Sequence, residues 1–279
     1  MKYYYINLNR VPERKAFMES QFKNLGLASK LHRIDATDAL TMRDQPCYRP
    51  HRWGARWELT PSEVACFISH RRCWEAMLAE GLDHVVIMED DVIVSDQMEA
   101  AVADIVRLGP TDFDVVKLDG VPQLCRYGTT QPLRDERRFR DVLQVAASAG
   151  CYLLSRQGAE RLLAGSNSFC DHLDDYVFNP ASGQTIYQLE PAVSVQAIWS
   201  SQAEGQAIDG KVAGSERTEN PHINSLPSRG PVLYRLAKEV RRSARKLYRR
   251  LYGDRMLTAS GGLIGAPQLA PDLGDYKRK

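Results

Sequence analysis

Three consecutive acidic residues, Glu89-Asp90-Asp91, directly follow a short apolar run at 84–88. In open α/β sheets, ligands bind beyond the carboxyl ends of the strands, so carboxylates in this position face a binding crevice. Adjacent carboxylates repel one another and usually need a cation or strong hydrogen-bond donors beside them. Hard oxygen ligands favour Mg²⁺ or Mn²⁺, commonly shared with a diphosphate. The alternative is a solvated acidic turn that binds nothing.

Two further acidic groups are weaker candidates. The segment Asp171-His172-Leu173-Asp174-Asp175 could supply a general base for a hydroxyl nucleophile, or it could simply begin a helix whose dipole stabilises acids. The segment Asp112-Phe113-Asp114 precedes its predicted strand and therefore points to the opposite edge of the sheet. The HExxH, GxSxG and GxGxxG fingerprints are absent from the sequence, so metalloprotease, serine hydrolase and dinucleotide-enzyme functions lack support.

Strands and helices alternate along the part of the chain that carries these residues. Short apolar segments predict strands at 1–8, 31–36, 84–88 and 114–118, and a strand pair or long extended run at 142–154. Helical spacing, N-cap residues and terminal glycines predict helices at 12–26, 60–81, 95–109 and 155–163. This alternation predicts a mainly parallel sheet covered on both faces by helices. The region 41–58 contains Pro and Trp and predicts an irregular loop over the site.

Composition excludes several other classes of protein. Apolar residues make up 43% and charged residues 26% of the 279 residues, which is typical of a globular chain and not of collagen, coiled coils or disordered proteins. No apolar stretch approaches the roughly 18 residues of a membrane span, and the N-terminus turns polar too early for a secretion signal. The six cysteines form no CxxC and no His/Cys pair at zinc spacing. We therefore expect reduced cysteines, no zinc site and a cytoplasmic protein.

The positive charge is concentrated near the C-terminus. From Gly230 to the end there are 12 Lys and Arg against 4 Asp and Glu, whereas the rest of the chain has 25 against 31. Residues 232–252 place eight cations beside an apolar stripe at helical spacing, which predicts a basic amphipathic helix that lies on an anionic membrane surface. Nucleic acid and a merely solvated helix are the alternatives. We expect no nucleic acid, because no pattern of interleaved aromatic residues indicates base stacking.

Several segments between about residues 3 and 200 occur in an order that is itself informative. They are Tyr5-Ile6-Asn7-Leu8-Asn9-Arg10 with Glu13-Arg14, Arg33-Ile34-Asp35-Ala36, the stretch 59–70, the stretch 87–92, the stretch 150–155 with Gly158-Ala159, and Cys170-Asp171-His172. Together they resemble glycosyltransferase family 25, the group of lipopolysaccharide and lipooligosaccharide galactosyltransferases. Ala65 stands where that family more often has glycine, and the basic tail lies outside the resemblance.

The resemblance implies a GT-A-like α/β fold, with a Rossmann-type mixed sheet that binds a nucleotide sugar and helices on both faces. It also implies a UDP-sugar donor and a divalent cation, Mn²⁺ or alternatively Mg²⁺. Asp91, with Glu89 or Asp90, would hold the metal on the diphosphate. The other residues carried over for the uridine side or the vicinity of the donor are Asn7, Arg10, Arg14, Asp35, Ala36, Ser69 and His70. Asp171 is the first candidate for the base, and Asp174 and Asp175 are the alternatives.

We therefore expect a glycosyltransferase that moves a sugar, galactose first, from a UDP-sugar to a hydroxyl of a lipopolysaccharide-type glycan or glycolipid. We also expect a metal to assist the transfer and the anomeric configuration to be inverted. The protein is expected to lie peripherally on the cytoplasmic face of the inner membrane. The predicted catalytic domain covers 1–225. The segment 226–279 is predicted to hold a linker, the basic helix and a disordered tail past Tyr252. By composition alone, the linker spans 220–231 and so begins slightly before this domain boundary. The alternatives are a Mg²⁺-dependent phosphohydrolase, and a non-catalytic protein that binds membrane or nucleic acid through its tail.

Overall fold

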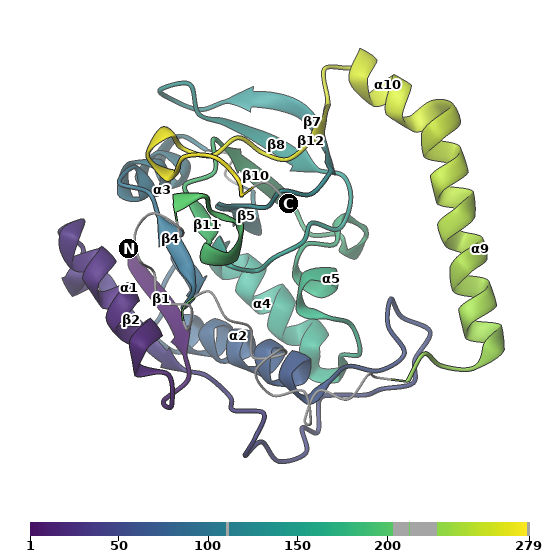
Figure 1. Ribbon diagram of the computed structural model, residues 1–279, viewed down its shortest axis with the longest axis horizontal. Coiled ribbons are helices and arrows are strands. Elements are labelled where there is room, and N and C mark those ends of the chain that lie inside the picture. The colour runs from purple at the N-terminus through teal and green to yellow at the C-terminus, as the bar shows by residue number, and fades with distance from the viewer. Residues whose placement is uncertain (110–111, 203–211, 213–227, 278–279) are drawn as a thin grey trace.

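The structure is a computed structural model that describes residues 1–109, 112–202, 212 and 228–277. Within these residues, nine strands form a large sheet in the order β12-β7-β8-β10-β5-β9-β3-β1-β2, and a small sheet has the order β4-β11-β6 (Figure 1). The large sheet contains β1 (Lys2–Asn7), β2 (Leu31–Asp35), β3 (His84–Glu89), β5 (Val115–Lys117), β7 (Cys125–Pro132), β8 (Arg138–Val142), β9 (Cys151–Ser155), β10 (Ile186–Glu190) and β12 (Leu263–Gly265). The small sheet contains β4 (Val92–Val94), β6 (Asp119–Gly120) and β11 (Ser194–Gln196).

Helices cover the large sheet on both faces (Figure 1). The α-helices are α1 (Pro12–Asn24), α2 (Pro61–Ala79), α3 (Met98–Leu108), α4 (Arg156–Gly165), α5 (Leu173–Val177), α9 (Val232–Tyr248) and α10 (Asp254–Ala259). Short 3₁₀ helices occur at Ala28–Lys30, Ser166–Ser168, Pro180–Ser182, Ala197–Trp199 and Pro271–Leu273, and a π-helical turn at Arg249–Gly253.

The core consists of two buried layers, one on each side of the sheet. Successive residues of a strand point to opposite faces, so a strand that is apolar throughout feeds both layers. Tyr3 and Tyr5 pack in one layer with Met18 of α1, whereas Tyr4 packs in the other with Trp74 of α2. This double burial explains why β1 and β3 are continuous apolar runs without a polar face.

The sheet is mixed and not mainly parallel. β1 runs parallel to both β2 and β3, and β10 runs parallel to β5. β9 lies antiparallel between β3 and β5, and β7, β8 and β12 add antiparallel neighbours. The prediction of a mainly parallel sheet was wrong because the direction of β9 depends on long-range pairing. The predicted α/β class, with a mixed sheet and helices on both faces, is confirmed.

Local capping signals set several helix boundaries. Thr60 accepts a hydrogen bond from the backbone N–H of Glu63, whose side chain accepts from the backbone of Thr60, so the predicted capping box begins α2. α3 begins at Met98, three residues after the predicted start at Ser95, whose hydroxyl accepts from the backbone N–H of Gln97. The predicted extended run at 142–154 is interrupted, because residues 143–150 form a loop between β8 and β9.

The prediction of disorder past Tyr252 is wrong for the described residues 253–277. β12 pairs antiparallel with β7 at the edge of the large sheet, and Leu273 is buried in the core layer that contains α1. Most of the predicted linker at 220–231 lies outside the described residues, which resume at Ser228.

The predicted basic helix is present as α9 and lies along one side of the molecule (Figure 1). Tyr234 in its first turn is buried against Trp53 and Trp57 of the loop at 41–58. The apolar side chains of the following turns are exposed, including Leu236 at 60% and Val240 at 60%. Among the described residues, no helix combines the length and hydropathy that a bilayer crossing requires.

Candidate functional site

A cavity of about 510 Å³ opens where three neighbouring parallel strands end. β1, β2 and β3 run in the same direction, so their carboxyl ends meet at one edge of the sheet. Leu8 follows β1, Ala36 follows β2 and Glu89 ends β3, and all three line the cavity. The acidic triplet therefore lies at the ligand-binding edge that its position after an apolar strand predicted.

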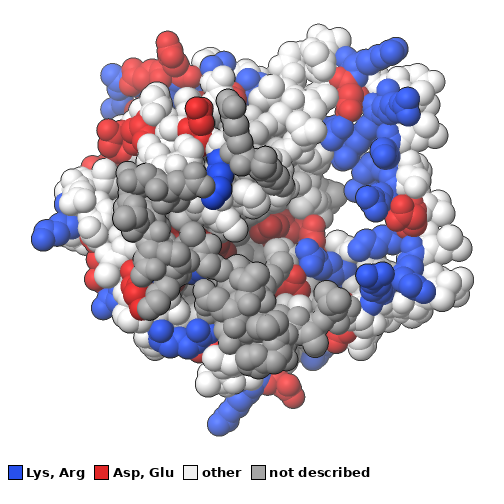
Figure 2. Space-filling view, viewed as in Figure 1, with Lys and Arg blue, Asp and Glu red and all other residues white. Residues whose placement is uncertain are grey.

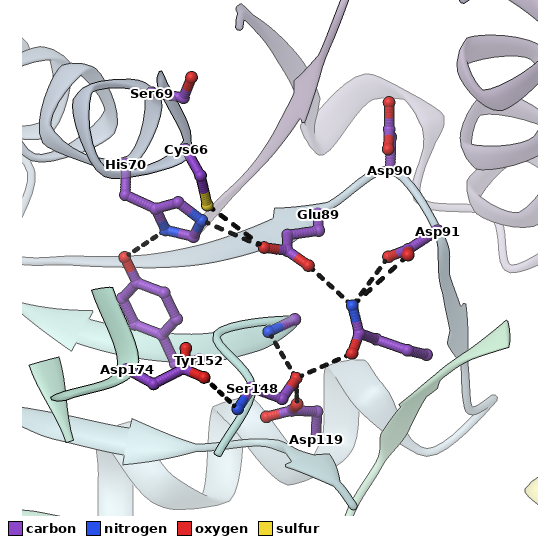
Figure 3. Close-up of polar contacts among 12 residues, drawn as sticks. Cys66, Ser69, His70, Glu89, Asp90, Asp91, Asp119, Ser148, Tyr152 and Asp174 are labelled. Atoms are coloured by element: carbon purple, nitrogen blue, oxygen red, sulfur yellow. Dashed lines mark hydrogen bonds and ion pairs between the residues drawn. The ribbon is translucent and has the colours of Figure 1, made fainter. Parts of the chain in front are cut away.

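Glu89 and Asp91 face the same polar side chain at the cavity wall. The Nε2 amide of Gln196 donates to Oε2 of Glu89 at 2.8 Å, and it lies 3.3 and 3.4 Å from the two carboxylate oxygens of Asp91. Figure 3 shows the carboxylates of Glu89 and Asp91 turned toward this shared contact. Two carboxylates thus converge on one neutral amide.

The electrostatics of this pair favour a bound cation. Burial raises the pKa of Glu89 to about 7, and the negative charges of Asp174 and Asp90 add to the effect. Burial and the charge of Glu89 likewise raise the pKa of Asp91 to about 7. Because each carboxylate makes ionisation of the other harder, a divalent cation between them would relieve a repulsion that the amide of Gln196 relieves only in part.

Asp90 points away from Glu89 and Asp91 (Figure 3). Its carboxylate accepts from Nδ2 of Asn7 at 2.7 Å and from the guanidinium of Arg14 at 2.9 Å. Asn7 is buried and also donates to the backbone of Val11, so it ties β1 to the start of α1. Asn7 and Asp90 therefore brace the turn after β3, while Arg14 also reaches the cavity wall.

A buried network supports the floor of the site. Lys117 at the end of β5 forms a fully buried ion pair with Asp119. Asp119 accepts from the hydroxyl of Ser148 at 2.6 Å, and the backbone N–H of Ser148 donates to Asp174 at 2.9 Å. Ser148 has a φ of 69°, in the left-handed region that is strained for a residue with a side chain. Strain held in place by several hydrogen bonds is common in loops that form functional sites.

The three carboxylates of the second acidic group, 171–175, lie in different places in the structure. Asp174 lines the cavity, opposite Glu89, within the network of Ser148. Asp171 accepts from the backbone N–H of Ala55 at 2.9 Å and lies outside the cavity lining, where it holds the loop at 41–58. Asp175 lies 3.7 Å from Arg56 of the same loop, and burial raises its pKa. Of the three candidates for the base, Asp174 is the one that reaches the cavity.

The residues expected around the nucleotide lie in three places: the main cavity, a smaller pocket and the protein surface. Ala36 and Ser69 line the main cavity, and the hydroxyl of Ser69 accepts from the backbone N–H of Thr37 at 2.8 Å. Arg10 lines a smaller adjoining pocket and pairs with Asp38 at 2.9 Å. Asp35 has an exposed side chain that pairs with Arg33 at the surface and lines neither pocket. The loop at 41–58 borders the smaller pocket through 41–43 and Gln45.

His70 is buried at the cavity wall on α2. Its Nδ1 lies 3.0 Å from the hydroxyl of Tyr152, which accepts from Nε1 of Trp74 at 2.9 Å. Burial lowers the pKa of His70 to about 3, so the imidazole is neutral at physiological pH. The other nitrogen, Nε2, points toward Glu89 at 3.7 Å and, within the described part of the chain, has no hydrogen-bond partner (Figure 3).

Three residues of this site were missed by the reasoning from sequence. Gln196, Ser148 and Asp119 belong to segments that carry no recognisable motif. Asp119 follows an apolar strand, as Glu89 ends one, so the same strand-end signal was available for it. The fold alone brings Gln196 and Ser148 to the cavity.

Comparisons with known proteins agree with the resemblance. The family model for glycosyltransferase family 25 (LPS biosynthesis protein) matches residues 1–177. The lipooligosaccharide biosynthesis protein lic2B of Haemophilus influenzae is 28% identical over 210 residues, which span 70% of this chain and 76% of that protein. A probable inactive glycosyltransferase 25 family member 3 of Rattus norvegicus is 31% identical over 175 residues, 57% of this chain and 29% of that protein. The chain thus spans less than a third of this animal relative.

Two solved glycosyltransferase structures are also similar. One, from a protein involved in the glycosylation of the major capsid of PBCV-1, has 8% identity and a TM-score of 0.39, and the match covers 81% of this chain and all of that one. The other is a mutant of a Drosophila β-1,4-galactosyltransferase 7 in complex with manganese, UDP-Gal and xylobiose. It has 11% identity and a TM-score of 0.34, and the match covers 67% of this chain and 65% of that one.

Proposed function

Because the chain belongs to glycosyltransferase family 25, we propose that it transfers a sugar, galactose first, from a UDP-sugar to a hydroxyl of a lipopolysaccharide-type glycan. One observation supports the proposal most: the Glu89 and Asp91 carboxylates converge on a single amide in a cavity at the carboxyl ends of parallel strands. Such a pair suits a divalent cation shared with a diphosphate. The relative from Haemophilus influenzae supports the acceptor class by its name alone.

The residues at this position fit a hard divalent cation. Both available ligands are carboxylate oxygens, and both belong to groups whose pKa is raised by burial and mutual repulsion. When Mn²⁺ or Mg²⁺ is bound, it supplies Lewis-acid compensation for the charge of the departing UDP. Glu89 and Asp91 would hold the cation, and Arg14 adds a positive charge to the cavity wall beside them.

Asp174 is the proposed general base. Its carboxylate lies in the same cavity as Glu89 and Asp91, and the backbone N–H of Ser148 orients one of its oxygens. A carboxylate in this position can accept the proton of an acceptor hydroxyl as that hydroxyl attacks the anomeric carbon, which typically adds about 10² to 10⁴ in rate. A single base across the sugar from the leaving group suits inversion, and NMR of the product would show its anomeric configuration.

A donor screen tests the proposed function. The purified chain is given UDP-galactose, UDP-glucose or UDP-N-acetylglucosamine with and without Mn²⁺, and the released UDP is measured. We expect Mn²⁺-dependent release that is fastest with UDP-galactose and absent in Asp91→Asn. The matched control is Asp112→Asn, an exposed carboxylate that precedes β5 at the opposite edge of the sheet. Equal turnover in wild type and Asp91→Asn would contradict the proposal.

The same assay, run also with simple phosphate esters, separates the transferase from a phosphohydrolase and from a non-catalytic protein. A phosphohydrolase would release phosphate from simple phosphate esters at a rate that needs no sugar acceptor. A non-catalytic protein, like the relatives named as inactive, would release no UDP from any donor. The strand-end position of Glu89 and Asp91 in a cavity disfavours the non-catalytic protein, and the family match disfavours both alternatives.

We further propose that α9 binds the surface of an anionic membrane, where a glycolipid acceptor would lie, so that the enzyme is peripheral on the cytoplasmic face. In Figure 2, Lys and Arg side chains form a nearly continuous column along α9. Its apolar side chains are exposed, with Leu233 at 72%, Leu236 at 60%, Val240 at 60% and Leu247 at 58%. Apolar side chains beside cations are the arrangement that binds the interface of an anionic bilayer.

Vesicle sedimentation tests this surface. Because deletion of 230–279 would also remove β12, point substitutions are preferable. We expect Leu236→Glu with Val240→Glu to abolish binding to phosphatidylglycerol-containing vesicles, since the pair lies on the exposed stripe. Leu124→Glu with Leu143→Glu is the matched control, because these leucines are exposed elsewhere, at 74% and 48%. Equal binding by both variants, or equal binding to neutral vesicles, would contradict the proposal, and tight binding to duplex DNA would favour nucleic acid.

A further inference from the structure

Three side chains with metal-binding atoms meet at the cavity wall beside the carboxylate pair. Cys66 and His70 are four residues apart on α2 and therefore lie on the same face of that helix. Glu89 comes to them from the end of β3 (Figure 3). Sγ of Cys66 is 3.9 Å and Nε2 of His70 is 3.7 Å from Oε1 of Glu89, and all three ligand atoms lie within 4.8 Å of one another.

The orphaned nitrogen of His70 is the independent observation that points to a ligand. His70 is 1% exposed, and its Nε2 has no hydrogen-bond partner among the residues that the structure describes, although it is aimed at Cys66 and Glu89. A buried polar atom without a partner is unfavourable, and a bound ion would supply the missing partner. The imidazole is neutral, as metal binding requires, because burial lowers its pKa.

We propose that Sγ of Cys66, Nε2 of His70 and Oε1 of Glu89 bind a divalent transition-metal ion of the zinc class. Bonds of about 2.0–2.3 Å in a tetrahedral site place ligand atoms roughly 3.3–3.6 Å apart, so the two separations from Oε1 of Glu89 need to close by only a few tenths of an ångström. All three residues line the cavity, which leaves the fourth position open toward it. Three protein ligands and an open position are typical of a reactive or regulatory site, whereas purely structural sites are closed.

The surroundings support the geometry of the imidazole. With its proton on Nδ1, His70 donates to the oxygen of Tyr152, which also accepts from Trp74, and Nε2 keeps its lone pair for the metal. Metal-binding histidines usually donate their second nitrogen in this way, which fixes the orientation of the ring. Here both neighbours are fully buried aromatic residues, so the ring has little freedom to turn away.

The site differs in chemistry from the carboxylate pair, although Glu89 belongs to both. Oε1 of Glu89 faces Cys66 and His70, whereas Oε2 faces Gln196 and the side of Asp91. A thiolate and an imidazole select zinc-class ions, whereas carboxylates alone suit Mn²⁺ and Mg²⁺. This site was not predicted from the sequence, because cysteine and histidine spacings were compared along the chain and not on a shared helix face. The proposal does not depend on sugar transfer.

Co²⁺ absorption tests the site directly, because a cobalt–thiolate bond gives a charge-transfer band that carboxylates do not. The full chain is stripped of metal and titrated with Co²⁺. We expect the band in wild type and in Asp91→Asn, its loss in Cys66→Ser, and weaker Co²⁺ binding in His70→Gln. Cys170→Ser is the matched control, because Cys170 is also partly exposed and lies on another segment. Excess Zn²⁺ should remove the band, whereas Mg²⁺ should not.

Absence of the band in wild type, or its survival in Cys66→Ser, would overturn the proposal. X-ray absorption at the zinc edge of the wild-type chain provides a test without any variant, since it should show one sulfur ligand with nitrogen and oxygen ligands. The outcome is separable from that of the donor screen. A protein that shows the cobalt band but releases no UDP would support this metal site and contradict the proposed function. A protein that releases UDP but shows no cobalt band would support the proposed function and contradict this metal site.

Discussion

The side-chain amide of Gln196 donates to Glu89 at 2.8 Å and lies 3.3 Å from Asp91, although Gln196 is more than a hundred residues away from both in the sequence. One neutral side chain therefore screens two carboxylates that would otherwise repel each other in a buried cavity. A hydrogen bond to a charged group is worth about 1.5–3 kcal/mol, so the amide offsets part of this repulsion.

Gln196→Glu should make the protein depend on metal for its stability. The substitution adds a third negative charge to the site, so we expect the metal-free protein at pH 8 to lose about 1–3 kcal/mol of unfolding free energy. Excess Mn²⁺ should restore most of this loss, because the added carboxylate can pair with the cation. Urea unfolding with and without Mn²⁺ measures both effects. A metal-free variant as stable as wild type at pH 8 would show that the three side chains do not converge.

The stability of the metal-free protein should fall as the pH rises from about 4 to about 7. Burial raises the pKa of Glu89 from 4.5 and that of Asp91 from 3.8, both to about 7, so the folded chain keeps protons that the unfolded chain has lost. Unfolding therefore becomes more favourable with rising pH across this range. The urea midpoint, measured at several pH values, should decline less steeply in Glu89→Gln with Asp91→Asn. An equal decline in this double variant would assign the effect to other groups.

Asp174→Asn should separate proton transfer from metal binding. The amide can still accept from the backbone N–H of Ser148, so the local structure survives, but it cannot take a proton. We expect the rate of transfer to fall by about 10²-fold to 10⁴-fold while Mn²⁺ affinity is unchanged. The comparison variant is Asp171→Asn, whose amide oxygen can likewise still accept from the backbone N–H of Ala55, and it should cost far less rate. A larger rate loss in Asp171→Asn would return the role of base to Asp171.

Leu273→Ala should destabilise the protein although Leu273 lies only a few residues from the C-terminus. This leucine is 1% exposed in the core layer that contains α1, so truncation leaves a cavity and costs about 2–5 kcal/mol. Leu251→Ala is the control, because Leu251 is 49% exposed and should change stability by less than about 0.5 kcal/mol. Urea unfolding compares the two. Equal stabilities would mean that the segment after α10 does not belong to the core.

Local sequence signals predicted the parts of this fold whose causes are local. The capping residues Thr60 and Glu63 specify the start of α2, and the apolar run before Glu89 specifies β3. The direction of β9 and the return of β12 to the sheet depend on pairing with distant strands, which no local pattern encodes. The expected disorder of the tail was wrong for the same reason.

In the candidate site, as in the fold, local sequence signals predicted some features and missed others. Glu89 and Asp91 were predicted because they follow an apolar strand, and they share the cavity wall. Asp90 was grouped with them because it is adjacent in sequence, but the turn directs it to Asn7 and Arg14. Adjacent residues in a turn point in different directions, so sequence adjacency does not establish a shared ligand.

The most direct test is a crystal structure of the chain soaked with Mn²⁺ and UDP. We predict Mn²⁺ between the carboxylates of Glu89 and Asp91, with the diphosphate on its open side and the amide of Gln196 displaced. Mn²⁺ and UDP bound away from these two residues, with the amide of Gln196 still in place between them, would contradict the central claim.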